Sequence, residues 1–177
     1  MKKFELTSET KINIFGKKLF RIKALISFGN VEAGETGGWV EKEENINQSG
    51  NAWVYDNAWV FGDAWVSGDA EVFGNARVFG NARVSGDARV SGNAEVFGNA
   101  EVFGDADYTT IHGFGTQFRT TTFFKCKDKK IRVSCGCFFG TIPEFREQVK
   151  NTRKGKIAEE YLMIADLMEK HFAEEAS

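Results

Sequence analysis

The chain has 177 residues, in which 23 Lys and Arg and 25 Asp and Glu give a formal net charge of -2 at pH 7. This near balance excludes a general attraction to nucleic acid or to membranes, so binding of either would need a local patch. No apolar run approaches the length of a membrane span, and the first residues lack the apolar stretch of a signal peptide, so we expect a cytoplasmic protein.

The start of the chain is expected to form a β-hairpin. Apolar residues alternate on both sides of a glycine turn at Gly16, which predicts two paired strands between Ile12 and Ile26. Val40 and Ile46 then suggest an irregular coil ahead of more regular sequence. Such a segment can act as a cap, which a solenoid needs because its bare end exposes unpaired strand edges.

Hexapeptide repeats run without interruption through the middle of the chain, in forms such as GNAWVY, GDAWVS, GNARVF and GNAEVF. A fixed period marks a solenoid, in which each unit is stabilised by stacking on its neighbours. Ala and Val are two residues apart, so in a strand both point to the inside. Gly followed by Asn or Asp is typical of turns. Each hexapeptide therefore predicts one strand and one corner.

The charges predict that three sides close one coil of eighteen residues. Every eighteenth outward residue changes sign, in the columns Glu71, Arg89 and Asp107, Arg77 and Glu95, and Arg83 and Glu101. Opposite charges on adjacent strands contribute about 0.2–1 kcal/mol each, whereas like charges repel. A twelve-residue coil would give a mixed pattern. The three columns begin with Trp53, Trp59 and Trp65.

A second module is expected after the repeats. Residues 120–135 alternate as a β-hairpin around Asp128 and Lys129. Thr141 to Glu144 form a capping box with a proline in the first helical turn, and a second helix follows from about residue 156 to 172. We therefore expect three regions, namely a cap over 1–49, a repeat region over 50–108 and a β-hairpin with two helices over 109–177.

The repeats resemble the hexapeptide-repeat superfamily, whose fold is the left-handed parallel β-helix. The segment 21–58, with RIKAL, VEAGETGGWVE and NAWVYDNA, resembles the start of hexapeptide-repeat proteins encoded by bacteriophages and prophages, and of bacterial acyltransferases known from sequence. TTTFFKCKDKKIRVSCGCFFGTIPEFREQVK resembles a C-terminal module of phage-type proteins. The resemblance implies a mainly β protein, a three-sided left-handed β-helix with an N-terminal hairpin cap and a small C-terminal α+β module.

Catalysis has little support in the residue types. Acyltransferases of this superfamily use a catalytic histidine near a loop or subunit junction, and its carbonic anhydrases use three histidines to hold a metal. Only His112 and His171 are present, and no insertion breaks the repeats to build a substrate pocket. His112, beside two glycines, is the one candidate for a general base. We expect no enzyme activity and no cofactor.

The cysteines suggest zinc only faintly. Cys126, Cys135 and Cys137 could join His112 as ligands, since thiolate and imidazole suit this metal. Their spacing does not match a common zinc finger. The alternative is a reduced hairpin in which Cys126 and Cys135 face each other in the core. We expect no metal site.

Two groups of residues are candidates for binding. The first is an aromatic belt, and Trp and Tyr at outward positions are typical interface anchors, although the cap or a second subunit could cover them instead. The second is a basic cluster that could contact nucleic acid or another partner. The belt comprises Trp39, Trp53, Trp59, Trp65, Tyr55 and Phe61, and the cluster comprises Arg119, Lys125, Lys127, Lys129, Lys130 and Arg132.

The favoured function is that of a non-enzymatic interaction protein. The phage resemblance implies a partner in a bacterial host, either a protein or a ribonucleoprotein, and inhibition of a defence system such as CRISPR. The rod is expected to assemble as a dimer or trimer, with nucleic acid as another partner and no membrane contact. The alternative is a relative of the acyltransferases, active or decayed.

Overall fold

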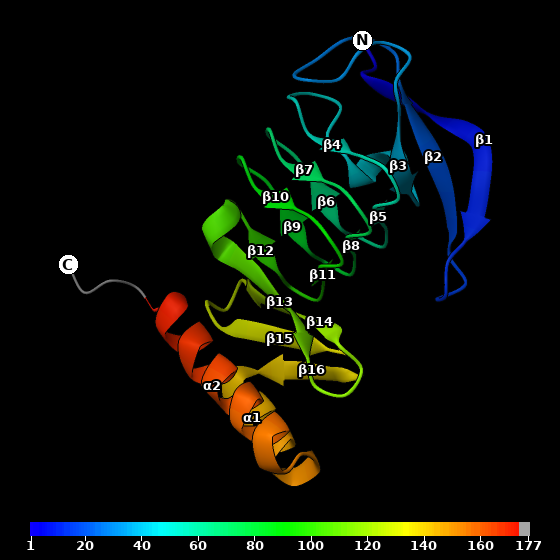
Figure 1. Ribbon diagram of the computed structural model, residues 1–177. Helices are drawn as coiled ribbons and strands as arrows, with labels where there is room; N and C mark the ends of the chain where they lie inside the picture. Colours follow the sequence, from blue (N-terminus) through cyan, green and yellow to red (C-terminus); the bar gives the residue numbers. More distant parts are fainter. Residues whose placement is uncertain (174–177) are drawn as a thin grey trace. The chain divides into compact units, whose positions relative to one another are not determined.

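The computed structural model describes residues 1–173 (Figure 1). Two compact units divide the chain between Asp105 and Ala106. We call residues 1–105 the solenoid unit and the described residues from Ala106 onward the C-terminal unit. Among residues 1–173, neither helix is long and apolar enough to cross a membrane.

The cap consists of three antiparallel strands, β1 (Phe4–Ile12), β2 (Lys18–Ala24) and β3 (Thr36–Val40). The expected hairpin is confirmed, and Gly16 in its turn has a positive φ of 74°. Its first strand begins at Phe4, however, well before Ile12. The polar residues of β1 hid this strand, because it has an edge position and carries little of the alternation that marks a half-buried strand.

Short parallel strands form the three sides of the solenoid, seen in Figure 1 as stacked arrows. One sheet has the order β1-β2-β3-β5-β8-β11, the second contains β10-β7-β4 and the third β12-β9-β6. The repeat strands are β4 (Trp53–Val54), β5 (Trp59–Val60), β6 (Trp65–Val66), β7 (Glu71–Val72), β8 (Arg77–Val78), β9 (Arg83–Val84), β10 (Arg89–Val90), β11 (Glu95–Val96) and β12 (Glu101–Val102). The three-sided parallel β-helix predicted from the sequence is confirmed.

The inside of the solenoid is filled by the repeated Ala and Val side chains. Ala76 and Val78, for example, are both fully buried, as are their counterparts in neighbouring coils. The corners use glycines with positive φ, as turn chemistry predicts. Where Asp56 replaces the glycine, it adopts the same left-handed region with a φ of 50°. Each coil therefore repeats one backbone course even where its sequence varies.

The Glu and Arg residues of the predicted charge columns lie on adjacent strands, whereas Asp107, expected to continue the first column, lies in a 3-10 turn after the last repeat strand. Glu71 pairs with Arg89, Arg77 with Glu95, and Arg83 with Glu101 in the parallel registers, which confirms the eighteen-residue spacing. Ion pairs join Arg89 Nε to Glu71 Oε2 at 3.0 Å and Arg77 Nη1 to Glu95 Oε1 at 3.3 Å. Both pairs contact solvent, so each contributes at most about 1 kcal/mol.

The C-terminal unit contains an antiparallel sheet of four strands in the order β13-β14-β15-β16. Its strands are β13 (Tyr108–Phe114), β14 (Arg119–Lys125), β15 (Ile131–Cys135) and β16 (Phe138–Thr141). The central hairpin β14-β15 matches the sequence-based prediction. The two outer strands were not predicted, because β16 is short and β13 lacks regular alternation of buried and exposed residues. Residues 1–173 also contain two 3-10 turns, η1 (Glu43–Asn45) and η2 (Asp105–Asp107).

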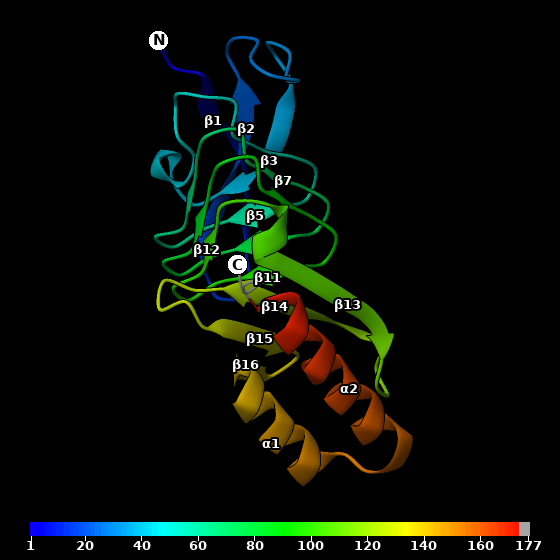
Figure 2. The ribbon, with the colours of Figure 1, turned by 90° about the vertical axis from the view of Figure 1, so that its left-hand side faces the viewer.

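Two helices lie side by side on this sheet, α1 (Ile142–Thr152) and α2 (Gly155–His171) (Figure 2). The predicted capping box is present, since the Thr141 side chain accepts from the Glu144 backbone N–H and the Glu144 carboxylate accepts from the Thr141 N–H. The predicted apolar stripe of α2 packs inward, with Tyr161, Ile164 and Met168 buried. The stripe therefore joins Phe123 and Phe145 in one core.

Candidate functional site

Half of the aromatic belt lies under the cap of the same chain. Trp39, Trp53 and Phe61 have exposed fractions of 7%, 0% and 4%. The Trp53 ring meets Phe4 of β1 and Phe28 edge to face, with ring centroids 5.9 and 5.4 Å apart. Trp53 and Phe61 serve the attachment of the cap, which was the alternative to partner binding, whereas Trp39 keeps a small exposed fraction beneath two cations.

The buried Phe61 begins an aromatic column at one corner of the solenoid. Phe61, Phe79 and Phe97 stack nearly parallel, with centroids 4.9 and 4.6 Å apart. Phe15 from the hairpin turn contacts the first two rings, at centroid distances of 5.7 and 5.6 Å. The predicted stacking within the solenoid is present, so this column contributes to packing.

The other half of the belt reaches solvent to different degrees. Trp65 is 38% exposed and lies beside Arg83 in its column. Tyr55 is half-buried, and its hydroxyl donates to Glu71 Oε1 at 3.3 Å. Burial, together with the neighbouring Glu71 carboxylate, raises the pKa of Tyr55 to about 12. The Tyr55 hydroxyl therefore stays protonated and acts as a hydrogen-bond donor.

Trp59 belongs to a surface where cations and indole rings alternate. The Lys11 ammonium lies over both Trp39 and Trp59, at 4.0 and 4.5 Å from the ring centroids. Arg21 lies over Trp39 at 5.0 Å, and Arg77 lies over Trp59 at 4.8 Å. We call these five residues the cation–aromatic face. Contacts of this kind contribute about 0.5–1 kcal/mol each at exposed sites.

The register of one sheet builds this face. Arg21 on β2 lies opposite Trp39 on β3, Trp39 lies beside Trp59 on β5, and Trp59 lies beside Arg77 on β8. Lys11 reaches the two indole rings from the outer strand β1. The cap thus supplies Lys11, Arg21 and Trp39, and the repeats supply Trp59 and Arg77.

Three positive charges are held close together on this face. Burial and the neighbouring Arg21 and Arg77 lower the pKa of Lys11 to about 8. Arg77 is partly compensated by Glu95, whereas the Arg21 Nη1 donates to the backbone oxygen of Asp56 at 3.1 Å. The Arg21 Nε and the Trp39 Nε1 are buried with no acceptor among residues 1–173. These two buried donors are closed to a partner, but the clustered charges of Lys11, Arg21 and Arg77 suit an acidic one.

The basic residues of the C-terminal unit do not form one uncompensated patch. Lys125 Nζ pairs with Asp107 at 2.9 Å, and Arg132 Nη2 pairs with Asp128 at 2.6 Å. Lys127, Lys129 and Lys130 lie in or beside the turn between β14 and β15, at the opposite end of β14 from Arg119. Arg119 is thus roughly 20 Å from Lys125 along the strand. The structure thus brings together the basic residues near the turn and leaves Arg119 apart from them.

The remaining sequence-based candidates do not meet. His112 is exposed on β13, with Nδ1 3.3 Å from Thr120 Oγ1. Cys126 and Cys135 do not face each other, because Thr121 is the partner of Cys135 and the Cys126 N–H donates to Lys130. Among residues 1–173, no group of three or more His, Cys, Asp or Glu side chains is placed to hold a metal.

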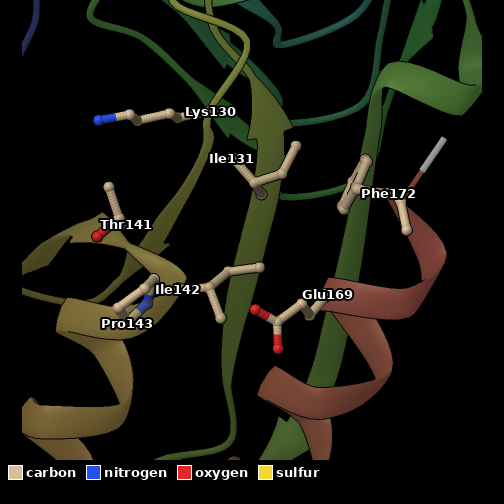
Figure 3. Close-up of a pocket in the computed structure, with 8 residues that line it drawn as sticks. Lys130, Ile131, Thr141, Ile142, Pro143, Glu169 and Phe172 are labelled. Carbon is tan, nitrogen blue, oxygen red and sulfur yellow. The ribbon is translucent and has the colours of Figure 1, made fainter.

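Figure 3 shows a cavity of about 330 Å³ in the C-terminal unit. Ile142 and Pro143 at the start of α1, Ile131 of β15 and Phe172 near the end of α2 give it mainly apolar walls, together with Lys130, Thr141, Glu169 and Ala173. Thr141 is engaged in the capping box, and Glu169 accepts from Arg146 Nη2 at 2.6 Å. In Figure 3 the Lys130 ammonium points away from Phe172. The residues that line this cavity do not place a nucleophile beside a general base.

Two residues of the cation–aromatic face, Lys11 and Arg21, were missed by sequence reasoning. Each is a cation followed by an isoleucine, Ile12 or Ile22, and this pattern gives no signal of binding. Their placement depends on a register shift in the cap, which lies between Leu6 and Thr10 in the β1-β2 pair. A prediction that β1 begins at Phe4 would have placed Lys11 on a strand of the cap.

Comparison with known proteins supports the repeat architecture. The family described as the YdcK β-solenoid repeat matches residues 70–86 and 82–96. Over 66 residues the chain is 36% identical to the uncharacterized acetyltransferase YdcK of Escherichia coli strain K12, a match that covers 32% of this chain and 19% of that protein. The chain thus matches about a fifth of the length of this relative. The fold is a β-helix similar to those of hexapeptide-repeat proteins.

Proposed function

We propose that this protein is a non-enzymatic interaction protein whose β-helix presents the cation–aromatic face to an acidic surface of another protein. The observation that carries the proposal is Lys11, held between Trp39 and Trp59 with Arg21 and Arg77 on either side. Aromatic residues and arginines are the side chains most often found as anchors of interfaces. Positive charge at such a surface also speeds association with an acidic partner.

The filled interior of the repeats favours a scaffold over an enzyme. Ala and Val occupy the inside of every coil and are buried. The repeats continue without an insertion that would form a substrate pocket. The outward residues vary, while the backbone course stays the same. A rigid support with a variable surface is suited to recognition.

The partner is proposed to be a bacterial host protein or ribonucleoprotein. The resemblance of the segment 21–58 to proteins encoded by phages and prophages supports this setting, in the host cytoplasm. In its most specific form, the proposal is that the protein inhibits a bacterial defence system such as CRISPR. Assembly as a dimer or trimer belongs to the same proposal, because a repeated rod offers identical surfaces for self-association.

The test is capture of a partner on the immobilised full chain from lysate of a bacterial host, with a charge-reversal variant beside it. Lys11→Glu combined with Arg21→Glu should abolish capture of a protein that the unchanged chain retains. Lys150→Glu, which reverses one charge at an exposed site on α1, is the control and should leave capture intact. Capture should also weaken as salt rises, since salt screens exposed charges.

Two results would contradict the proposal. Equal capture by the double variant and the unchanged chain would place the interface elsewhere. Loss of capture after nuclease digestion would identify a nucleic acid as the bound species. Lys11→Gln with Arg21→Gln guards against a folding defect, because these neutral side chains remove charge without bringing carboxylates onto the indole rings.

A second candidate is an acyltransferase-related function. The similarity to the uncharacterized acetyltransferase YdcK favours it, although that match includes only 19% of the relative. His112 is the candidate base. Addition of acetyl-CoA should then raise the melting temperature of the chain through binding to the folded state. Absence of a shift at millimolar acetyl-CoA would exclude this candidate.

A further inference from the structure

A second cavity in the C-terminal unit, of about 190 Å³, has polar walls. It lies between the β15-β16 turn, the end of α1 and the first turns of α2. The residues that matter for its chemistry are Arg119, Cys135, Cys137, Gln148, Arg153 and Tyr161. They join two guanidinium groups, an amide, a phenol and two thiols around one small space.

The turn between β15 and β16 places both thiols at this cavity. Cys135 pairs with Phe138 across the turn, so Gly136 and Cys137 are its two central residues. Gly136 has a φ of 61°, and a Cβ there would collide with the guanidinium of Arg119. The Arg119 side chain therefore lies across the Cys-Gly-Cys turn, where the positive φ of Gly136 favours glycine.

The cavity carries uncompensated positive charge. Neither Arg119 nor Arg153 forms a salt bridge with a carboxylate in the described part of the chain. Arg153 ends α1, and its backbone N–H donates to Val149. Guanidinium groups bind carboxylates through paired, charge-assisted hydrogen bonds. Two of them beside an amide form a site for an anion.

The two thiols differ in access. Cys135 is half-buried, and its Sγ accepts from Thr121 Oγ1 at 3.1 Å. Burial and the neighbouring Cys135 raise the pKa of Tyr161, so its phenol stays neutral. Cys137 is exposed at the mouth. A reagent in the cavity would therefore reach Cys137 first.

We propose that this cavity binds an anionic low-molecular-weight disulfide of the glutathione class, and that Cys137 exchanges with it. The carboxylates of the ligand bind to Arg119 and Arg153. The Cys137 thiolate attacks one sulfur of the disulfide, an S–S bond forms between Cys137 and that sulfur, and the original S–S bond breaks. The second half of the ligand leaves as a thiolate, so the count of electrons is unchanged.

The experiment measures the rate of mixed-disulfide formation on the purified full chain by intact mass. Glutathione disulfide is the anionic probe and cystamine is the cationic one, each normalised to its rate with a free cysteine peptide. The normalised rate with glutathione disulfide should exceed that with cystamine by about fivefold or more. Peptide mapping should place the adduct on Cys137.

Three variants and one control variant separate a site from a merely exposed thiol. Cys137→Ser should abolish the adduct, and Arg119→Gln or Arg153→Gln should each reduce the preference for the anionic probe at least about threefold. Lys150→Gln removes a charge from α1 outside the cavity and should change nothing. Equal normalised rates for the two probes, an adduct on Cys126, or an unchanged preference in both arginine variants would overturn the proposal.

Discussion

The two units of the protein build their cores by opposite means. In the solenoid unit the same small residues recur, as in Ala76 and Val78, and each coil covers the next. In the C-terminal unit, single aromatic residues interlock. Phe145 meets Phe123 and Tyr161 edge to face, with centroids 6.3 and 5.7 Å apart.

This difference separates the kinds of site that each unit can form. A periodic core leaves the outward positions free of packing demands, so the solenoid can vary its surface and present an extended face. An aperiodic core of large side chains leaves gaps at its margins, and both cavities described above are lined by residues of the C-terminal unit. Recognition of a macromolecule fits the first unit, and binding of a small ligand fits the second.

The largest expected effect on stability in the solenoid unit is at its tryptophans. Trp53→Ala should lower the free energy of unfolding by about 3–5 kcal/mol, because the fully buried ring joins the cap to the coils. Trp65→Ala, at the equivalent outward position but 38% exposed, should cost under about 1 kcal/mol. Urea denaturation, monitored by hydrogen exchange in the solenoid unit, measures the unfolding free energies of both variants. Similar losses of unfolding free energy in the two variants would mean that burial of Trp53 by the cap adds no stability.

The corner glycines provide a matched pair for the stacking of coils. Gly86 and Gly92 have nearly equal φ values of 65° and 64°. A Cβ on Gly86 would collide with the backbone oxygen of Phe103, whereas a Cβ on Gly92 meets nothing within 4 Å. Gly92→Ala should cost about 1–2 kcal/mol from backbone conformation alone. Gly86→Ala should cost about 1–3 kcal/mol more, from the overlap with the next coil.

Thermal unfolding of the two variants gives this difference. If Gly86→Ala and Gly92→Ala melt at the same temperature, the close approach of successive coils does not limit the corner residue.

A pH series examines two lysines of the cap, Lys3 and Lys11. The Lys3 ammonium donates to the backbone oxygens of Gly50 and Ala52, at 3.3 and 2.9 Å. Burial lowers the pKa of Lys3 to about 8, and the pKa of Lys11 is also about 8, against an ordinary value of 10.5. The unfolded chain therefore binds more protons between pH 8 and 10.5, and stability rises across this range.

The stability maximum should lie near pH 10, because the raised pKa of Tyr55, about 12, makes stability fall above the ordinary tyrosine value of 10.0. Lys3→Met should flatten the rise by about 1–2 kcal/mol, after allowance for solvent screening. Urea midpoints between pH 7 and 10 measure it. An unaltered slope in Lys3→Met would show that Lys3 keeps its ordinary pKa.

The smallest effect is expected at a charge column. Arg89→Glu places a carboxylate beside Glu71 and should cost about 0.2–1 kcal/mol, and adding Glu71→Arg should restore most of it. The double-mutant cycle isolates the coupling of the two side chains. The coupling should shrink in high salt. Zero coupling at low salt would mean that the columns mark the register without stabilising it.

The sequence by itself determined the coil and most of the C-terminal secondary structure. The spacing of Ala and Val recurs in many hexapeptides, so the pattern remains clear even where one hexapeptide departs from it. The alternation of Arg77 with Glu95 then set the eighteen-residue register. The capping box at Thr141 marked the start of α1 through contacts within four residues.

Only the tertiary structure placed the candidate sites. Lys11 meets Trp39 and Trp59 because β1 adds to the edge of the sheet in one particular register, with an irregularity that no local pattern signals. Arg119 crosses the Cys-Gly-Cys turn because the β14-β15 pairing sets Thr121 opposite Cys135, a register that the predicted hairpin left open. Periodic contacts can be predicted from the repeats, whereas these contacts depend on strand registers that no local pattern specifies.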